Sequence, residues 1–313
     1  MLNSYFNASD LVFSPPVMFG NLTVVPILNK KATNQDYLCL DEAMNLGVAQ
    51  VTETSVNGSV PELYFLNNGD KPILLLDGEE LVGAKQNRVL NLTIMVPAYS
   101  KVIIPVSCVE QGRWSWRSSQ FKAANRTLFA EARVAKMSQV TRSMSNSTNY
   151  RSDQHEIWNS IAAKSERFSV DSSTSAASDI YENRAADLDK FVEQFKTTDG
   201  QVGAAFIVKG KLAGTELFGD TKALSQLLPK LIRSYGLDSL DKSISKKSEP
   251  IDENALKEFY ELILNTPGLS KKAIGLGEDI RIESKKILAA ALVSEKGLIH
   301  LSAFARGYGS TRH

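Results

Sequence analysis

Short apolar runs separated by turn-forming residues dominate the first third of the chain. The runs are rich in Val, Ile and Leu, and they are Asn21–Leu28, Leu63–Leu66, Ile73–Leu76, Val89–Val96 and Val102–Val106. Clusters of Asn, Gly, Asp and Pro stand between them, which is typical of antiparallel strands joined by tight turns. The pattern predicts a mainly antiparallel sheet or barrel over residues 20–110, with one helix at Tyr37–Asn45 that stops at Gly47.

Helical spacing of apolar residues follows. Apolar residues at 157–162 and again at 180–195 recur at intervals that put them on one face of a helix. Two polar stretches rich in Ser and Thr, Ser138–Thr148 and Ser169–Ser178, are expected as flexible surface loops. The alternative for these stretches is a mobile lid over a site.

The last third mixes the two patterns. Val202–Val208 and Leu212–Phe218 predict two strands, and Thr221–Tyr235 predicts an amphipathic helix that Pro229 should kink or split. Asp252 is expected to cap another helix. Three short apolar runs predict three closing strands, over residues 279–283, 287–293 and 298–304.

These patterns predict an α+β fold in three parts. Residues 1–126 form a β-rich region that carries the candidate site, residues 127–200 a helical region with Ser/Thr-rich loops, and residues 201–313 a smaller mixed α+β unit. All three are expected to belong to one compact unit overall. A parallel, doubly wound sheet is not expected, because strands and helices do not alternate regularly before residue 150.

Charge is balanced over the whole chain but not along it. The 36 Lys and Arg face 35 Asp and Glu, so no global field attracts nucleic acid or a membrane surface. Residues 101–151, however, hold nine basic residues against two acidic ones. No apolar stretch reaches the roughly 18 residues that a membrane span needs, and no secretory signal is visible at the start. With only two cysteines, the sequence predicts a soluble, cytoplasmic protein without a membrane partner.

The side chains most capable of chemistry lie between Leu76 and Trp116. Three carboxylates there are candidates for acid/base catalysis: Glu79, Glu80 and Glu110. The candidate ligand-binding residues are polar or aromatic groups at strand edges: Lys85, Gln86, Asn87, Arg88, Asn91, Arg113 and Trp114. If the chain is extended here, Gln86 and Arg88 share one face and Asn87 and Asn91 the other. The alternative is a pair of surface ion pairs, Glu79–Lys85 and Glu80–Arg88.

A basic and aromatic stretch begins at Arg113 and continues to Lys136. An arginine that binds phosphate beside a tryptophan that stacks on a base suits a nucleotide or a single-stranded nucleic acid. Nucleic acid is the less favoured partner, because the rest of the chain is not basic. The alternative is a tryptophan core followed by a solvated basic helix, at whose start Arg126 is expected.

Several common sites are absent from the sequence. The three histidines lack zinc-ligand spacing, so no metal site is predicted, and no P-loop, Rossmann or G-x-S-x-G motif occurs. Cys108 is expected to be a buried structural thiol rather than a nucleophile. His300 alternates with Ile299 and Leu301, so it should leave the apolar face of its strand. It is a further candidate ligand-binding residue, with a hydrogen-bonded structural histidine as the alternative.

Two sequence blocks resemble a known family. L-D-G-E-E-L-V-G-A-K-Q-N-R-V-L-N at 76–91 and I-P-V-S-C-V-E-Q-G-R-W at 104–114 resemble the domain family named for its association with ADP-ribosylglycohydrolases and rhodanese-phosphatases. Later pieces, such as G-T-E-L-F-G-D at 214–220, extend the resemblance over residues 10–304. The resemblance implies a link to NAD- and ADP-ribose-derived nucleotides, and it implies no particular catalytic residue, cofactor or oligomeric state.

The residues and the resemblance favour the same function, a protein that binds, and as an enzyme would hydrolyse, an ADP-ribose-like nucleotide. The pyrophosphate would contact Lys85, Arg88 or Arg113, the ribose Glu79, Glu80 or Asn91, and the adenine Trp114 or Trp116. Glu79, Glu80 and Glu110 would be the acid/base groups, and the side chains should converge on one concave surface. The alternative is a non-catalytic module that senses or sequesters a nucleotide, or docks on a protein or nucleic acid.

Overall fold

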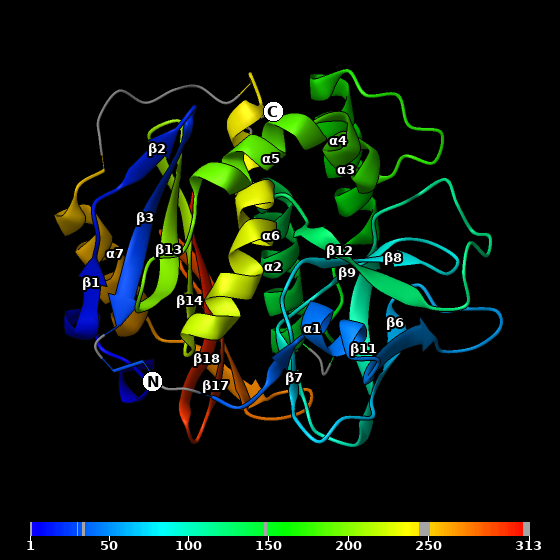
Figure 1. Cartoon of the computed structure of the whole chain (residues 1–313), viewed down its shortest axis with the longest axis horizontal. Helices are drawn as coiled ribbons and strands as arrows, with labels where there is room; N and C mark the ends of the chain where they lie inside the picture. The colour runs from blue at the N-terminus through cyan, green and yellow to red at the C-terminus, as the bar shows by residue number, and fades with distance from the viewer. Residues whose placement is uncertain (1, 30, 33–34, 147–148, 244–250, 309–313) are drawn as a thin grey trace. The chain divides into compact units, whose positions relative to one another are not determined.

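The chain divides by its contacts into two compact units, which Figure 1 draws together as one cartoon. The computed structural model describes residues 2–29, 31–32, 35–146, 149–243 and 251–308. Unit 1 consists of Met1–Gln35, Leu188–Ala273 and Gly277–His313, and unit 2 of Asp36–Asp187 and Ile274–Leu276. The N-terminal strands therefore belong with the C-terminal third of the chain, and the segment richest in candidate site residues lies in unit 2.

Unit 1 is built on one antiparallel sheet of nine strands. Their order is β1-β3-β13-β14-β18-β17-β16-β15, and β2 also pairs with β3. The strands are β1 (Leu11–Phe13), β2 (Val17–Phe19), β3 (Leu22–Asn29), β13 (Gln201–Val208), β14 (Lys211–Phe218), β15 (Leu269–Lys272), β16 (Glu278–Glu283), β17 (Ile287–Ser294) and β18 (Gly297–Ala305). Figure 1 shows the blue β3 beside the yellow-green β13. The run expected to join the sheet of residues 20–110 thus forms β3 but pairs with a strand about 180 residues away.

Three helices belong wholly or mostly to unit 1: α5 (Ala185–Gln194), whose first three residues are assigned to unit 2, α6 (Thr221–Leu240) and α7 (Glu253–Asn265). Asp252 caps α7 as expected, since its side chain accepts a hydrogen bond from the backbone N–H of Ala255. Helix α6 is continuous through Pro229, so the predicted split is wrong. Its buried leucine-rich face packs on β13 and β14, and that burial offsets the roughly 3 kcal/mol cost of an interior proline.

Unit 2 contains a curled six-stranded sheet, in the order β12-β8-β9-β11-β6-β5, and a three-stranded sheet, β10-β7-β4. The strands are β4 (Leu38–Cys39), β5 (Ala49–Glu53), β6 (Glu62–Asn67), β7 (Ile73–Leu75), β8 (Glu79–Gly83), β9 (Arg88–Leu90), β10 (Ile94–Val96), β11 (Ser100–Cys108) and β12 (Phe121–Thr127). All pairs are antiparallel except β4 with β7. The end strands β12 and β5 also contact one another, so the sheet curls into a half-barrel around a core that includes Phe65, Leu90 and Val106. The predicted α+β class with mainly antiparallel sheets is confirmed.

The run Val89–Val96 was predicted as one strand and is instead divided between β9 and β10. The break follows from hydrogen bonds that compete with the sheet ladder. Nζ of Lys136 donates to the carbonyls of Leu90 and Asn91, and the Asn91 amide donates to the carbonyl of Tyr150. The chain therefore leaves the first sheet at residue 91 and enters the second at residue 94.

Four helices belong to unit 2: α1 (Leu40–Asn45), α2 (Ala130–Asn146), α3 (Gln154–Phe168) and α4 (Ala177–Asn183). Residues 138–146, predicted as a loop, are the second half of α2, and residues 147–148 of that stretch lie outside the described residues. Val140, Thr141 and Met144 are buried on one face, so tertiary packing overrides the weak helix propensity of Ser and Thr. In the part of the chain that the structure describes, no helix is long and apolar enough to cross a membrane.

Candidate functional site

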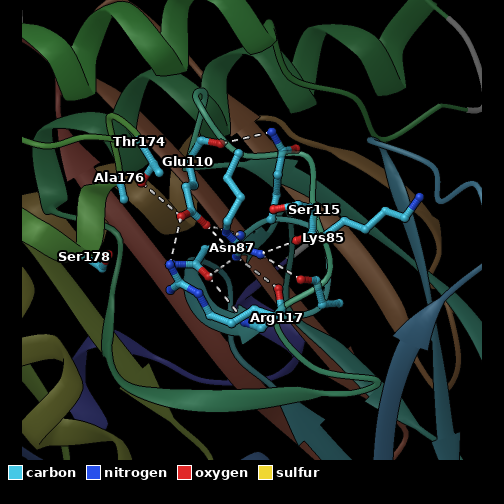
Figure 2. Close-up of polar contacts among 12 residues, drawn as sticks. Lys85, Asn87, Glu110, Ser115, Arg117, Thr174, Ala176 and Ser178 are labelled. Atoms are coloured by element: carbon cyan, nitrogen blue, oxygen red, sulfur yellow. Dashed lines mark hydrogen bonds and ion pairs between the residues drawn. The ribbon is translucent and has the colours of Figure 1, made fainter.

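Two segments of unit 2 meet at the end of the half-barrel sheet: the turn at residues 84–87 between β8 and β9, and the loop at residues 109–118 after β11. They leave the sheet side by side, because Arg88 of β9 is paired with Cys108 of β11. Backbone hydrogen bonds join them, from Val109 to Asn87 and from Arg117 to Ala84. Residues more than twenty positions apart in the sequence thereby form one cluster, drawn in Figure 2.

Glu110 is the centre of this cluster. Its Oε2 accepts hydrogen bonds from Nη2 of Arg113 at 2.6 Å and from the backbone N–H of Asn87 at 3.0 Å. Its Oε1 accepts one from the hydroxyl of Thr174 at 3.0 Å (Figure 2). Burial alone would raise the pKa of Glu110, but the Arg113 guanidinium and the Asn87 N–H hold that pKa below its ordinary value. The carboxylate is therefore ionised at neutral pH.

The guanidinium of Arg113 makes several hydrogen bonds within the protein. Besides Glu110, its guanidinium donates hydrogen bonds to the carbonyls of Gly83, Ala84 and Ser115 and to Oδ1 of Asn87. Ala84 has φ of +39°, in the left-handed region that L-residues seldom occupy. Arg113 thus fixes a strained turn as well as the charge on Glu110.

Arg88 lies next to this pair and differs from it. Its side chain is fully buried, and Nη1 donates to Oε1 of Gln86 at 2.9 Å, which agrees with the predicted shared face of these two residues. Nε and Nη2 of Arg88 make no hydrogen bond to any described residue, and none of the described carboxylates forms an ion pair with it. Burial lowers the pKa of Arg88, and the nearby Cys108, Glu53 and Glu110 oppose that shift.

Two exposed tryptophans lie above these buried groups. Trp114 and Trp116 are 47% and 50% exposed, and Nζ of Lys85 is 5.3 and 5.2 Å from their ring centroids. Figure 2 shows the Lys85 side chain pointing away from Glu110. We call Lys85, Trp114 and Trp116 the tryptophan platform. Trp116 also lines a shallow cavity of about 430 Å³ with Arg117.

Glu53 is a site residue that sequence reasoning missed. It ends β5, is 8% exposed, and its Oε1 accepts a hydrogen bond from the backbone N–H of Lys85. Its Oε2 is buried and makes no hydrogen bond to a described residue. A Cβ built on Gly58 would lie 3.2 Å from that oxygen and 3.3 Å from Cζ2 of Trp114, so carboxylate and indole are neighbours. The alternation of Val51 and Glu53 on the inward face of β5 is the signal that could have found it.

The other carboxylates have partners of a different kind. Oε2 of Glu79 accepts a hydrogen bond from the backbone N–H of Leu76, and Oε2 of Glu80 accepts one from Nε of Arg126. Arg126 was expected at a solvated helix start, and that expectation is wrong, because it lies buried on β12, which pairs with β8. Neither of the expected surface ion pairs, Glu79–Lys85 and Glu80–Arg88, forms among the described residues.

Asn91 and His300 are also engaged by hydrogen bonds. Oδ1 of Asn91 accepts from the hydroxyl of Ser107, while its amide donates to Tyr150. His300 belongs to unit 1, where its Nε2 lies 2.9 Å from Oε2 of the fully buried Glu216. These contacts account for both side chains within the fold, and a ligand role for either stays a prediction.

The second Ser/Thr-rich stretch lies directly on Glu110. We call residues 169–176 the strap. The carbonyl of Thr174 accepts a hydrogen bond from the backbone N–H of Gly112. Ala177, which directly follows the strap, donates its backbone N–H to the carbonyl of Val109. A Cβ at Gly112 would come within 2.9 Å of Cα of Thr174, so this close approach requires a glycine. The strap is therefore held against the loop that carries Glu110, and it covers this carboxylate.

Cys108 is buried, as expected, and burial raises the pKa of its thiol. A high pKa disfavours the thiolate that a nucleophile requires. Within the described ranges, no group of three or more His, Cys, Asp or Glu side chains has an arrangement that would hold a metal ion. The side chains that the cluster itself offers for chemistry are carboxylates, guanidinium groups and indole rings.

Comparisons with known proteins identify the family. No curated protein and no solved structure matches the chain. A family model, described as the ARG and Rhodanese-Phosphatase-superfamily-associated Protein domain, matches residues 10–304. That range covers nearly the whole chain, including both units, and it confirms the resemblance carried by the blocks at 76–91 and 104–114. The chain belongs to the ARG and Rhodanese-Phosphatase-superfamily-associated Protein domain family.

Proposed function

We propose that unit 2 binds an ADP-ribose- or NAD-derived nucleotide on the tryptophan platform. The observation that carries this proposal is a pair of half-exposed indoles, Trp114 and Trp116. Nζ of Lys85 lies within cation–π distance of both rings. Exposed indoles offer faces on which a purine can stack, and an adjacent ammonium group attracts phosphate. The family's association with ADP-ribose metabolism supports the same class of ligand.

For hydrolysis, Glu110 is the carboxylate that the proposal assigns as the base. It is ionised at neutral pH, and the side chain of Arg117, which lines the cavity beside Trp116, lies 3.9 Å from its Oε1. Glu79 and Glu80 are tied instead to Leu76 and Arg126. An ionised carboxylate can take a proton from an attacking water once the Thr174 hydroxyl withdraws. The alternative function, a nucleotide sensor, needs only the platform.

Binding is tested by calorimetric titration of the full chain with ADP-ribose, NAD and AMP. Trp114→Ala and Trp116→Ala should each weaken binding by about 1–3 kcal/mol, which is roughly 5- to 150-fold, because each removes a stacking face. Lys101→Ala is the matched control: Nζ of Lys101 lies 3.6 Å from the ring centroid of Tyr64 in the same unit, away from the platform. Equal small effects of all three variants, or preference for a single-stranded oligonucleotide over every nucleotide, would contradict the proposal.

Product analysis of any bound nucleotide separates the enzyme from the sensor. Glu110→Gln should abolish turnover and leave the affinity for ADP-ribose within about threefold of wild type. Wild-type protein that binds the nucleotide and releases no product over hours would assign it the sensing function.

A further inference from the structure

We infer that Arg88 and Glu53 form a sugar-phosphate subsite behind Trp114, in which Arg88 binds the phosphate and Glu53 a sugar hydroxyl. The inference rests on the proposed function, because the subsite lies directly under the platform on which the base would stack. It goes further by naming the groups that select the ligand.

Arg88 supplies the first half of the evidence. A guanidinium that is 0% exposed normally has a carboxylate partner, since an isolated buried charge costs several kcal/mol. Of the polar groups in the described chain, only Oε1 of Gln86 and the carbonyl of Asn87 accept from it, both at Nη1. Nε and Nη2 make no hydrogen bond there. A bidentate oxyanion is the group that would satisfy this edge of the guanidinium.

Glu53 supplies the second half, independently. It is more than nine-tenths buried, its Oε1 is taken by the backbone N–H of Lys85, and its Oε2 makes no hydrogen bond within the described part of the chain. A carboxylate oxygen only accepts hydrogen bonds, so the group that satisfies it must be a donor such as a hydroxyl.

Trp114 brings the two together. The guanidinium carbon of Arg88 is 5.6 Å from the centroid of this ring. Cζ2 of the same ring and Oε2 of Glu53 both lie within 3.3 Å of the position that a Cβ on Gly58 would take. A buried donor edge and a buried acceptor atom are therefore neighbours of one half-exposed indole.

The combination selects a class of ligand. A plain dicarboxylate would satisfy Arg88 but be repelled by Glu53, and an uncharged nucleoside would leave Arg88 without an anion. A phosphorylated sugar carries both an oxyanion and hydroxyl donors. The ribose phosphate part of an ADP-ribose-like nucleotide has this composition, and ribose 5-phosphate is its simplest probe.

The test is calorimetric titration of the full chain with ribose 5-phosphate, inorganic phosphate and adenosine. Arg88→Met should weaken the binding of both phosphate-containing probes by tenfold or more. Glu53→Gln should weaken ribose 5-phosphate by about tenfold and leave inorganic phosphate unchanged or tighter. Adenosine should bind both variants like wild type. Arg151→Met and Glu62→Gln, which remove matched charges elsewhere in unit 2, should change none of these affinities.

A second arginine variant guards against loss of folding. Arg88→Lys keeps the buried charge and loses the planar fork, and it should also lose tenfold in affinity for ribose 5-phosphate. Affinities for ribose 5-phosphate that are equal in wild type, Arg88→Lys and Glu53→Gln would overturn the subsite.

The same titrations separate the two proposals. If adenosine and ADP-ribose bind to the platform and the Arg88 and Glu53 variants bind ADP-ribose as wild type does, the subsite is wrong and the platform stands. If ribose 5-phosphate binding depends on both residues while no nucleotide depends on the tryptophans, the subsite stands and the platform is wrong.

Discussion

Each unit buries an ionisable side chain, and the two side chains differ in how completely the protein satisfies their hydrogen bonds. In unit 1, Oε1 of Glu216 accepts hydrogen bonds from Tyr235 and Ser302, and Oε2 is hydrogen-bonded to Nε2 of His300. In unit 2, Arg88 uses one edge of its guanidinium and leaves the other without a hydrogen bond among the described residues. Both side chains are essentially inaccessible to solvent.

Under the proposal made for Arg88, this difference separates a group that stabilises the fold from a group whose hydrogen bonds a ligand would complete. A buried charge with its hydrogen bonds made is costly to disturb, because removal of one partner strands the others. A buried charge with open hydrogen-bonding capacity lowers stability until something fills it. Burial alone, therefore, does not distinguish a structural ion pair from a binding site, and Arg88 differs from Arg113 in having no ion pair and hydrogen bonds at one nitrogen only.

The largest effect is expected where the network is complete. Glu216→Ala should lower the free energy of unfolding by about 3–5 kcal/mol. The substitution removes the hydrogen-bond partner of His300, Tyr235 and Ser302, which remain buried. Urea unfolding followed by circular dichroism measures it. The control is Glu278→Ala on the exposed end of β16, which should cost under about 1 kcal/mol. Equal urea midpoints for Glu216→Ala and Glu278→Ala would show that the hydrogen bonds of Glu216 do not stabilise unit 1.

Two neighbouring arginines sharpen the comparison within unit 2. Arg113→Met should cost about 3 kcal/mol or more, since it breaks the pair with Glu110 and frees three backbone carbonyls. Arg88→Met should be neutral or stabilising by about 1–2 kcal/mol, because a well-packed apolar chain replaces a buried cation without an ion pair. Parallel urea melts of the ligand-free variants compare them, and a larger loss for Arg88→Met than for Arg113→Met would show that Arg88 is a structural residue.

The smallest effect is a dependence on pH. The pKa of Glu110 is depressed in the folded state, so the stabilising contribution of its charge is complete above the pKa of an unperturbed glutamate and is lost as the pH falls through the lower folded pKa. The difference in unfolding free energy between wild type and Glu110→Gln should shrink as the pH falls from about 5 to about 3. Urea midpoints across that range measure it, and a constant difference would show that ionisation of Glu110 contributes nothing.

Local patterns predicted most elements of the fold. Short apolar runs located β13, β14 and the three closing strands, because these strands are buried along most of their length. The same patterns could not assign β3 to its sheet, since its partner β13 is about 180 residues away. Nor could they place the break after β9, which depends on Lys136 donating from α2 to Leu90 and Asn91.

The candidate site was predicted in composition more than in geometry. The residue types between Leu76 and Trp116 indicated the segment on which the candidate site is built, because charged residues in otherwise apolar strands are unusual. The sequence did not indicate which arginine has its hydrogen bonds and ion pair supplied by the protein, since Arg88 and Arg113 differ only in their tertiary contacts. Thr174 and Glu53 reach the site from distant segments, and only the folded chain reveals them.

The platform also gives the protein an optical label of its own. The chain has three tryptophans: Trp114 and Trp116 belong to the platform, and Trp158 lies on α3. Indole emission changes in intensity and wavelength when water at the ring is replaced by a stacked base or a phosphate. Stopped-flow fluorescence of the unmodified protein can thus follow association in real time, and Trp158→Phe would leave a signal that arises from the candidate site alone.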